Sequence, residues 1–263
     1  MMLHAASSLA HRVAFAPSRT LAQPDFGEVA LLIAGSRGME TVLRSRRLMT
    51  SALRRVSSLD PAVLMRPRTD LLTRATGICA EEVAEAVVDE VAHSMDRRST
   101  NGLVDLLQGP GTIEMGDVQM ELDGANVIFR HGRASEEVDG VVAVGKEPDR
   151  LVIYDVTTSP SYLAEKLEDG EEFFQDLRAY FASRYDITLE KWHILMDYKR
   201  QGELQPFDSP IRALRTPESA TVSSGVHILA LPLQRLVRQM REQVLSMIDE
   251  RGAYLFGGMA HHN

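Results

Sequence analysis

Cysteine is almost absent from the sequence: among 263 residues there is only Cys79. One cysteine cannot form an internal disulfide or a cysteine-based zinc site, and such scarcity is typical of proteins in a reducing compartment. Histidine shows no metal-ligand spacing beyond the adjacent pair His261 and His262. There is no Gly-x-Ser-x-Gly motif, and Cys79 has no evident histidine partner. These absences argue against disulfide scaffolds, structural zinc sites and acyl-transfer enzymes.

Long hydrophobic runs are also missing. No apolar stretch approaches the roughly 20 residues that cross a bilayer, so we expect no membrane partner. The run at 30–34 is too short and too far from the N-terminus for a signal-peptide core. Residues 1–24 lack acids and contain Arg12 and Arg19, a composition shared with mitochondrial transit peptides and with loosely ordered N-termini. We expect a cytoplasmic location, with the mitochondrial matrix as the alternative.

Lysine is scarce and charge is unevenly distributed. Residues 1–76 contain eleven arginines, no lysine and five acids, which gives +6, so a net charge of −8 leaves −14 for the remainder. A basic front on an acidic body is compatible with an appendage that faces nucleic acid. It is equally compatible with a helix that docks on its own acidic domain. The overall acidity argues mildly against non-specific DNA binding, which depends on phosphate neutralisation. The lysines are Lys146, Lys166, Lys191 and Lys199.

The chain is long enough for one large domain, or for one domain with a helical appendage. Apolar residues recur at helical spacing from Met39 to Val56, which predicts an amphipathic helix with a basic outer face. That face either contacts nucleic acid or is simply solvated. Prolines at 61 and 67 indicate a linker. We therefore expect a basic, partly irregular N-terminal helical region over 1–70 and a core domain over 71–263. The outer-face arginines are Arg44, Arg47, Arg54 and Arg55.

The remaining periodicity predicts an α+β domain. The stretch from Gly77 to Met95 is an amphipathic helix with an acidic face, and alternation around Asp123-Gly124 predicts a hairpin. Ser159-Pro160 is a helix-start signal, with Ser as the cap and Pro at the first position. We expect a loop at 100–116, a helix from Ser159 to about Arg184, strands at 191–198 and 226–231, and a closing helix at 233–250.

The most informative stretch is a second predicted hairpin. Val141–Val144 and Leu151–Ile153 are β-branched apolar runs that flank a short polar turn. Asp139 precedes the first strand and Asp155 lies near the end of the second, so antiparallel pairing brings the two positions together. Two facing carboxylates repel unless a cation lies between them, and a divalent metal is the obvious candidate. With the hairpin at 112–130, this predicts a meander of about four strands.

This stretch resembles the signature of the restriction-endonuclease-like, or PD-(D/E)XK, nuclease superfamily. In that signature an acid before one strand is followed by a turn and by an apolar strand that ends in acid-x-Lys. The resemblance covers about residues 120–170, and Thr157 stands where the signature has lysine. It implies an α/β (α+β) fold with a central mixed sheet of four to six strands flanked by helices, beside the N-terminal helical appendage. The predicted order of helix, meander, helix and strand agrees with it.

The resemblance also implies the site. Asp139 and Asp155 would bind Mg²⁺ or Mn²⁺, with the backbone carbonyl of Val156 as a further ligand. Glu137, two residues before Asp139, is expected on the same face as an extra or supporting ligand. Lys166 is the natural substitute for the missing lysine, because a long side chain on the following helix can reach back to the strand end. The ordinary alternative is a surface charge, and Lys199 is a second candidate. In the superfamily the preceding helix sometimes donates a Glu, here Glu82, Glu85 or Glu90.

Two functional hypotheses follow. In the first, the chain is a metal-dependent nuclease that hydrolyses phosphodiester bonds, with DNA favoured over RNA as the substrate. In the second, it is a catalytically inactive relative that binds nucleic acid or protein, as a subunit or a homodimer. The acid pair favours the first hypothesis, whereas Thr157 and the acidic body favour the second. A helical adaptor with no chemical purpose is a third possibility.

Overall fold

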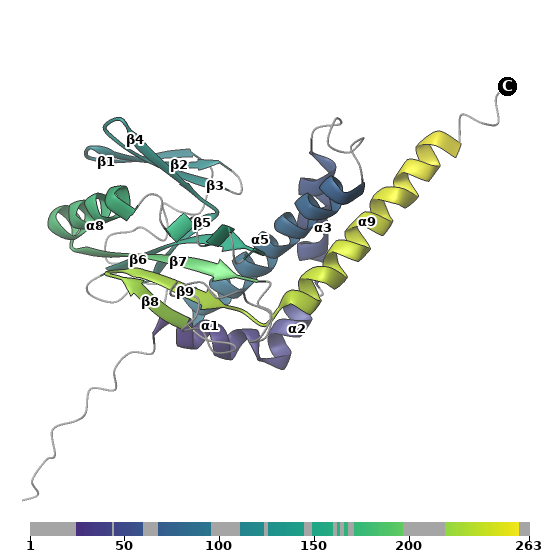
Figure 1. The fold of residues 1–263 in the computed structure, drawn as a ribbon, viewed down its shortest axis with the longest axis horizontal. Helices are drawn as coiled ribbons and strands as arrows, with labels where there is room; N and C mark the ends of the chain where they lie inside the picture. The colour runs from purple at the N-terminus through teal and green to yellow at the C-terminus, as the bar shows by residue number, and fades with distance from the viewer. Residues whose placement is uncertain are drawn as a thin grey trace, which may run out of the picture.

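The computed structural model describes residues 25–43, 45–59, 68–95, 111–123, 126–144, 149–159, 162–163, 166–167, 171–196 and 219–257. These residues form a mixed α/β structure with a four-stranded and a five-stranded sheet (Figure 1). The described strands are β1 (Gly111–Met115), β2 (Val118–Asp123), β3 (Asn126–His131), β4 (Ala134–Val138), β5 (Gly140–Val144), β6 (Asp149–Thr157), β7 (Ile187–Leu195), β8 (Ser219–Ser223) and β9 (Val226–Ala230).

The five-stranded sheet has the order β5-β6-β7-β9-β8. β5 and β6 form the predicted antiparallel hairpin, with Gly140 opposite Tyr154. β6, β7 and β9 run parallel to one another, and β8 is antiparallel to β9. The expected central mixed sheet flanked by helices is confirmed. The carboxyl ends of β6, β7 and β9 meet at one edge, which is where open α/β sheets bind ligands.

Alternation along β6 sends side chains to two separate cores. Val152 and Tyr154 join one cluster with α5 (Arg68–Ser94), whereas Leu151 and Ile153 join another. The second cluster includes three fully buried side chains of α8 (Glu171–Tyr185) and the inner face of the four-stranded sheet. The five-stranded sheet is therefore a middle layer, with helices on one face and α8 plus the second sheet on the other.

The first four strands do not continue into the β5–β6 hairpin as one meander, so that prediction was wrong. β1 to β4 form a separate antiparallel sheet, and the chain leaves it after Val138. Asp139 is the single residue between β4 and β5, and its N–H donates to the carbonyl of Tyr154 at 3.0 Å. The expected loop at 100–116 is also wrong in its last part, because β1 begins at Gly111.

The basic N-terminal region is helical and packs on the rest of the chain. It consists of α1 (Phe26–Ala34), α2 (Arg37–Leu43) and α3 (Arg46–Ser57). The single helix predicted over 39–56 is therefore divided in two. Ser45 has extended backbone angles and caps α3 by accepting a hydrogen bond from the Leu48 N–H at 3.4 Å, which starts a new helix there. Phe26 of α1 packs against Trp192 of β7, with ring centroids 5.1 Å apart.

α5 runs continuously through residue 70, where we expected the N-terminal region to end. The predicted linker at 60–67 lies outside the described residues, as do most residues between Ser159 and Glu171. In the part that is described, 162–163 and 166–167 are helical and α8 begins at Glu171. The closing helix α9 (Gln234–Gly257) packs on α5 and α3 and projects beyond the sheets (Figure 1). None of the described helices is both long and apolar enough to span a membrane.

Candidate functional site

Asp139 lies at the junction of the two sheets, beside β6. Its Oδ2 accepts a hydrogen bond from the backbone N–H of Val156 at 2.6 Å, so its carboxylate rests against the peptide that follows Asp155. Burial raises the pKa of Asp139 from 3.8 to about 6; the Val156 N–H and Lys166 lower it, whereas the charges of Glu81 and Asp155 raise it further. The two aspartates are therefore close enough to repel each other.

Asp155 is buried and surrounded by cationic or titratable side chains. Its Oδ1 lies 3.1 Å from Nζ of Lys166. Its Oδ2 lies 3.6 Å from Nζ of Lys191 and 3.7 Å from Nδ1 of His193, both from the neighbouring strand β7. Both carboxylate oxygens therefore lie next to cationic or titratable side chains, and the negative charge of the buried carboxylate is balanced by the two lysines.

His193 is neutral in this setting. Burial lowers its pKa to about 4, against the opposing effect of Asp155, and Lys191 and Lys166 lower it further. Its Nδ1 has no hydrogen-bond partner among the described residues. It lines a cavity of about 20 Å³ with Lys166 and Lys191, a volume that admits roughly one water molecule.

Lys191 joins the two sheets through an ion pair. Its Nζ contacts Glu136 Oε1 of β4 as well as Asp155, and the side chains of Lys191 and Glu136 are both largely buried. Sequence reasoning missed Lys191, Glu136 and His193. The sequence feature that could have identified Lys191 and His193 is the alternation of β7, which places positions 191 and 193 on the same face of the strand.

Lys166 occupies the place that sequence reasoning proposed for it, at the carboxylate of Asp155 and 5.4 Å from the ring centre of Tyr162. Burial alone would lower the pKa of Lys166, but Asp155 and Asp139 together raise it, so the amine stays charged. The side chain of Thr157 makes a local hydrogen bond instead: its Oγ1 accepts from the Ser159 N–H at 3.1 Å. Lys199 lies outside the described residues.

Glu137 does not reach the acid pair, and the expectation that it shares the face of Asp139 was wrong. It is exposed on β4 and accepts a hydrogen bond from the side chain of Asn126. The strand ends at Val138, so the two-residue periodicity does not extend to Asp139 at the junction. Glu136, one position earlier, is the acid that faces the site.

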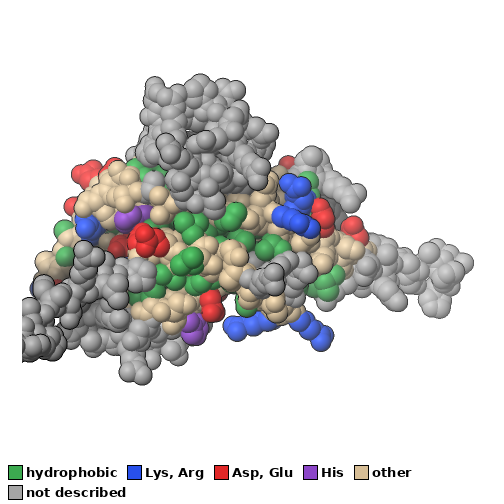
Figure 2. All heavy atoms as spheres, turned by 90° about the horizontal axis from the view of Figure 1, so that it is seen from below, with side chains coloured by type: hydrophobic (Ala, Val, Ile, Leu, Met, Phe, Trp, Pro, Cys, Tyr) green, Lys and Arg blue, Asp and Glu red, His purple; other side chains and the backbone are tan. Residues whose placement is uncertain are grey.

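The proposed basic face separates into different environments. Arg47 and Arg54 are exposed on α3, and Arg44 lies outside the described residues. Arg55 turns inward and pairs with Glu81 and, at 3.3 Å, with Glu82 of α5, so it was wrongly assigned to a nucleic-acid surface. On the face drawn in Figure 2, the Lys and Arg side chains of the described residues occur in separated groups between apolar and acidic ones.

Among the acids of α5, Glu81 is the one whose charge acts on Asp139. Glu82 was one of the helix acids proposed from the sequence, but it is buried against α3 and accepts from Ser51 Oγ at 2.9 Å. Glu85 contributes to raising the pKa of Tyr154, together with Asp139 and others, after the larger effect of burial. Glu81, which sequence reasoning did not name, thus acts on Asp139 through its charge while its own carboxylate pairs with Arg55.

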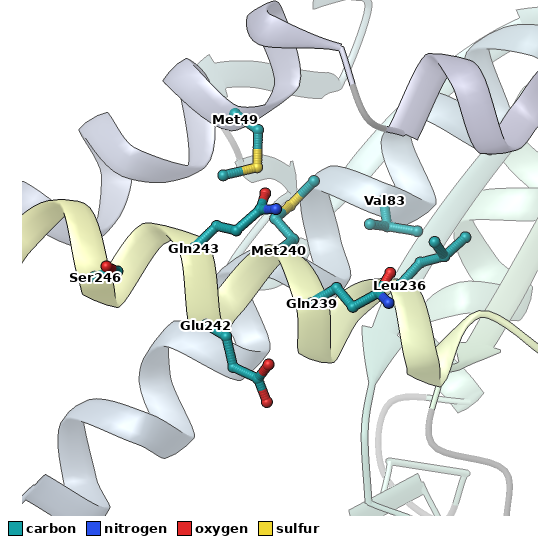
Figure 3. A pocket seen from close by; sticks show the side chains of 8 residues that line it. All are labelled: Met49, Val83, Leu236, Gln239, Met240, Glu242, Gln243 and Ser246. Atoms are coloured by element: carbon teal, nitrogen blue, oxygen red, sulfur yellow. The ribbon is translucent and has the colours of Figure 1, made fainter.

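A groove of about 580 Å³ lies between α3, α5 and α9 (Figure 3), and neither Asp139 nor Asp155 lines it. Met49, Val83 and Met240 supply its apolar side, and glutamines of α9 supply much of the rest. Glu242 is its one ionisable lining residue in the described part of the chain. This groove lacks the paired acids and lysines that make the Asp139–Asp155 region chemically distinctive.

Comparisons with known proteins found no matching protein-family model, no similar curated protein and no similar solved structure. Within the described residues, no group of three or more His, Cys, Asp or Glu side chains is arranged to hold a metal ion. The acid pair supplies the hard oxygen ligands that Mg²⁺ and Mn²⁺ prefer, and Mg²⁺ is commonly bound by one or two carboxylates together with water and phosphate. Asp139 and Asp155 are two carboxylates of this kind, and both oxygens of Asp155 already face lysine side chains.

Proposed function

We propose that the five-stranded sheet with α5 and α8 is a restriction-endonuclease-like core, and that the chain is a metal-dependent nuclease. The observation that carries this proposal is the 3.1 Å contact between Lys166 Nζ and Asp155 Oδ1. It supplies a cation at the acid pair although Thr157 stands at the position of the motif lysine. Mixed sheet topology and the buried hairpin support the same core.

In the proposed reaction, a water oxygen bonds to phosphorus while the bond from phosphorus to one sugar oxygen breaks. The attacking water gives up a proton to the solvent, and the leaving sugar oxygen takes a proton from a solvent water. Asp139 and Asp155 would hold Mg²⁺ or Mn²⁺, which when bound stabilises the developing negative charge and lowers the pKa of water. Lys166 orients the water and balances charge on the phosphate oxygens. Lys191 holds the Asp155 carboxylate in place from β7, and neutral His193 lies beside it. The Val156 N–H fixes the Asp139 carboxylate at the strand end.

Glu81 contributes to the electrostatics of the pair from the helical side. Its charge raises the pKa of Asp139, and its carboxylate is held by Arg55. No acid of α5 is assigned as a metal ligand, because no group of three or more His, Cys, Asp or Glu in the described residues is arranged to hold a metal ion.

A second function is favoured by the same contacts. Lys166 and Lys191 occupy both oxygens of Asp155, so its charge is already compensated within the protein. An inactive relative that kept the fold as a nucleic-acid-binding or protein-interaction subunit would have this self-contained network. This candidate requires no metal binding at the acid pair.

A plasmid-cleavage assay with Mn²⁺ separates the two functions. The nuclease proposal requires Mn²⁺-dependent cleavage that falls at least about 100-fold in Asp139→Ala and in Lys166→Ala, as expected when a charge acting on the transition state is lost. Arg130→Ala is a control, because Arg130 is an exposed arginine of β3 that pairs with Glu121 and was not assigned to the nucleic-acid-binding face. Cleavage that all three substitutions leave unchanged would place the active site elsewhere, and no cleavage by folded wild-type protein would favour the inactive relative.

A further inference from the structure

A small cavity with both polar and apolar lining lies at the carboxyl edge of the parallel strands, where β6 and β7 end beside the start of α9. It has a volume of about 90 Å³, several times the roughly 10–15 Å³ that one water requires. The backbone of the two strands meets there, because the Met196 N–H donates to the Thr157 carbonyl at 2.9 Å. Its polar lining comes from Thr76, Thr158, Gln234, Arg238 and Arg241.

The charge of this cavity is positive. Arg238 and Arg241 lie one turn apart on α9, and among the described lining residues there is no acid. Arg241 Nη1 donates to Thr76 Oγ1 at 3.2 Å, while its buried Nε has no hydrogen-bond partner in the described structure. Among the described acids, Glu242 pairs with this guanidinium, at 3.7 Å from Nη2, and its side chain is largely exposed. A buried guanidinium N–H without an acceptor is costly, so an anionic ligand would remove an existing deficit.

The donors suit a phosphate group. A guanidinium presents a planar fork of N–H groups that matches phosphate oxygens, and Arg238 adds a second cation from the same helix face. Hydroxyls of Thr76 and Thr158 and the amide of Gln234 approach from other elements, which suits a tetrahedral ligand with several acceptor oxygens. The first turn of α9, which contributes Gln234 and Val237 to the lining, also favours negative charge through the helix dipole.

We propose that this cavity binds a phosphate group, and that in a nucleic-acid strand it holds a phosphate neighbouring the one at the acid pair. Thr158 is three residues beyond Asp155, so the two Cα atoms are at most about 11 Å apart. A phosphate held there would align a strand across the carboxyl edge of the sheet. The assignment to nucleic acid rests on the proposed function, whereas the affinity for phosphate does not.

The test is an NMR titration of the full chain with inorganic phosphate in the presence of EDTA. We expect saturable shifts at Thr158 and in the first turns of α9, with a Kd at least about tenfold weaker in Arg238→Gln. The matched control is Arg235→Gln, an exposed arginine one turn earlier on α9 that does not line the cavity. Absence of saturable binding, or equal weakening in both variants, would overturn the proposal. Arg241→Gln is a second variant, and equal binding in folded Arg238→Gln and Arg241→Gln and in wild type would also overturn it.

Oligonucleotide competition identifies the source of the phosphate. A short single strand without terminal phosphate should displace inorganic phosphate if a backbone phosphate enters the cavity. Displacement only by a 5′-phosphorylated strand would identify a terminal phosphate, and displacement by neither would overturn the assignment to nucleic acid. Asp155→Asn should retain phosphate binding while losing cleavage, so failure of the nuclease proposal and failure of the phosphate site are distinguishable.

Discussion

Lys166 and Asp155 are joined by a 3.1 Å ion pair although eleven residues separate them in sequence. Asp155 lies near the end of β6, and Lys166 follows in a helical segment beyond Ser159. The pair places a charged amine beside the two aspartates without a lysine at position 157. Because Asp155 is buried, the same pair also neutralises a charge that would otherwise be expensive.

Lys166→Met should separate metal binding from catalysis. Since Lys166 competes with a metal ion for Asp155, its removal should strengthen Mn²⁺ binding severalfold while it reduces cleavage by at least about 100-fold. Calorimetric titration and the plasmid assay on the same preparation measure the two effects. If cleavage and Mn²⁺ affinity fall together, Lys166 supports the site only structurally.

Lys191→Met should destabilise the fold strongly. The substitution leaves Glu136 and Asp155 as neighbouring buried acids with one fewer cation, which typically costs about 3–5 kcal/mol. Urea denaturation at pH 7 gives the change in the free energy of unfolding, and Glu136→Gln in the same chain should recover part of it. The control is Arg130→Gln, which breaks an exposed pair with Glu121 and should cost less than about 1 kcal/mol. A loss below that limit for Lys191→Met would contradict the compensated network.

Asp139→Asn should change how stability depends on pH. Because the pKa of Asp139 is raised from 3.8 to about 6, the unfolded chain loses this proton first, and wild-type stability should fall as pH rises from about 4 to 6. The full penalty, at most about 3 kcal/mol, applies above pH 6. Asparagine cannot ionise and still accepts from Val156, so the variant should be more stable at pH 7 and equal to wild type below pH 4. Parallel pH profiles in chemical denaturation with EDTA would contradict the raised pKa.

Gly140→Ala should disturb the junction that positions Asp139. A Cβ at Gly140 would overlap the ring and hydroxyl of Tyr154, which is buried. We expect a loss of about 1–3 kcal/mol, as is typical of overpacking. Gly77→Ala is the control, because no atom lies within 4 Å of its added Cβ in α5 and it should be neutral or stabilising. Thermal unfolding of both variants measures the difference, and a harmless Gly140→Ala would mean that Tyr154 moves freely.

The sequence predicted those parts of the fold in which local pattern and burial agree. β-Branched runs at 141–144 and 151–153 became the β5–β6 hairpin, and the periodicity at 77–95 became the larger part of α5. The position of Lys166 was also predictable, because a long side chain on the element after β6 can reach the strand end. These features depend on short separations along the chain.

Features that depend on distant pairing were missed. The two sheets are separated at a single residue, Asp139. Its backbone N–H donates to Tyr154 of β6, whereas β4 pairs with β3. Because β4 ends before Asp139, Glu137 does not share the face of Asp139 and instead accepts a hydrogen bond from Asn126. Glu136 is the residue of β4 that pairs with Lys191. Arg55 looked solvated because its partners, Glu81 and Glu82, are more than twenty residues away in sequence.

Calorimetric titration with Mn²⁺ tests most directly whether Asp139 and Asp155 act together on one cation. We expect saturable binding to the wild-type chain at micromolar to millimolar concentrations, and its loss in folded Asp155→Asn. Saturable binding that persists unchanged in Asp155→Asn, or no binding to the folded wild-type chain, would contradict it.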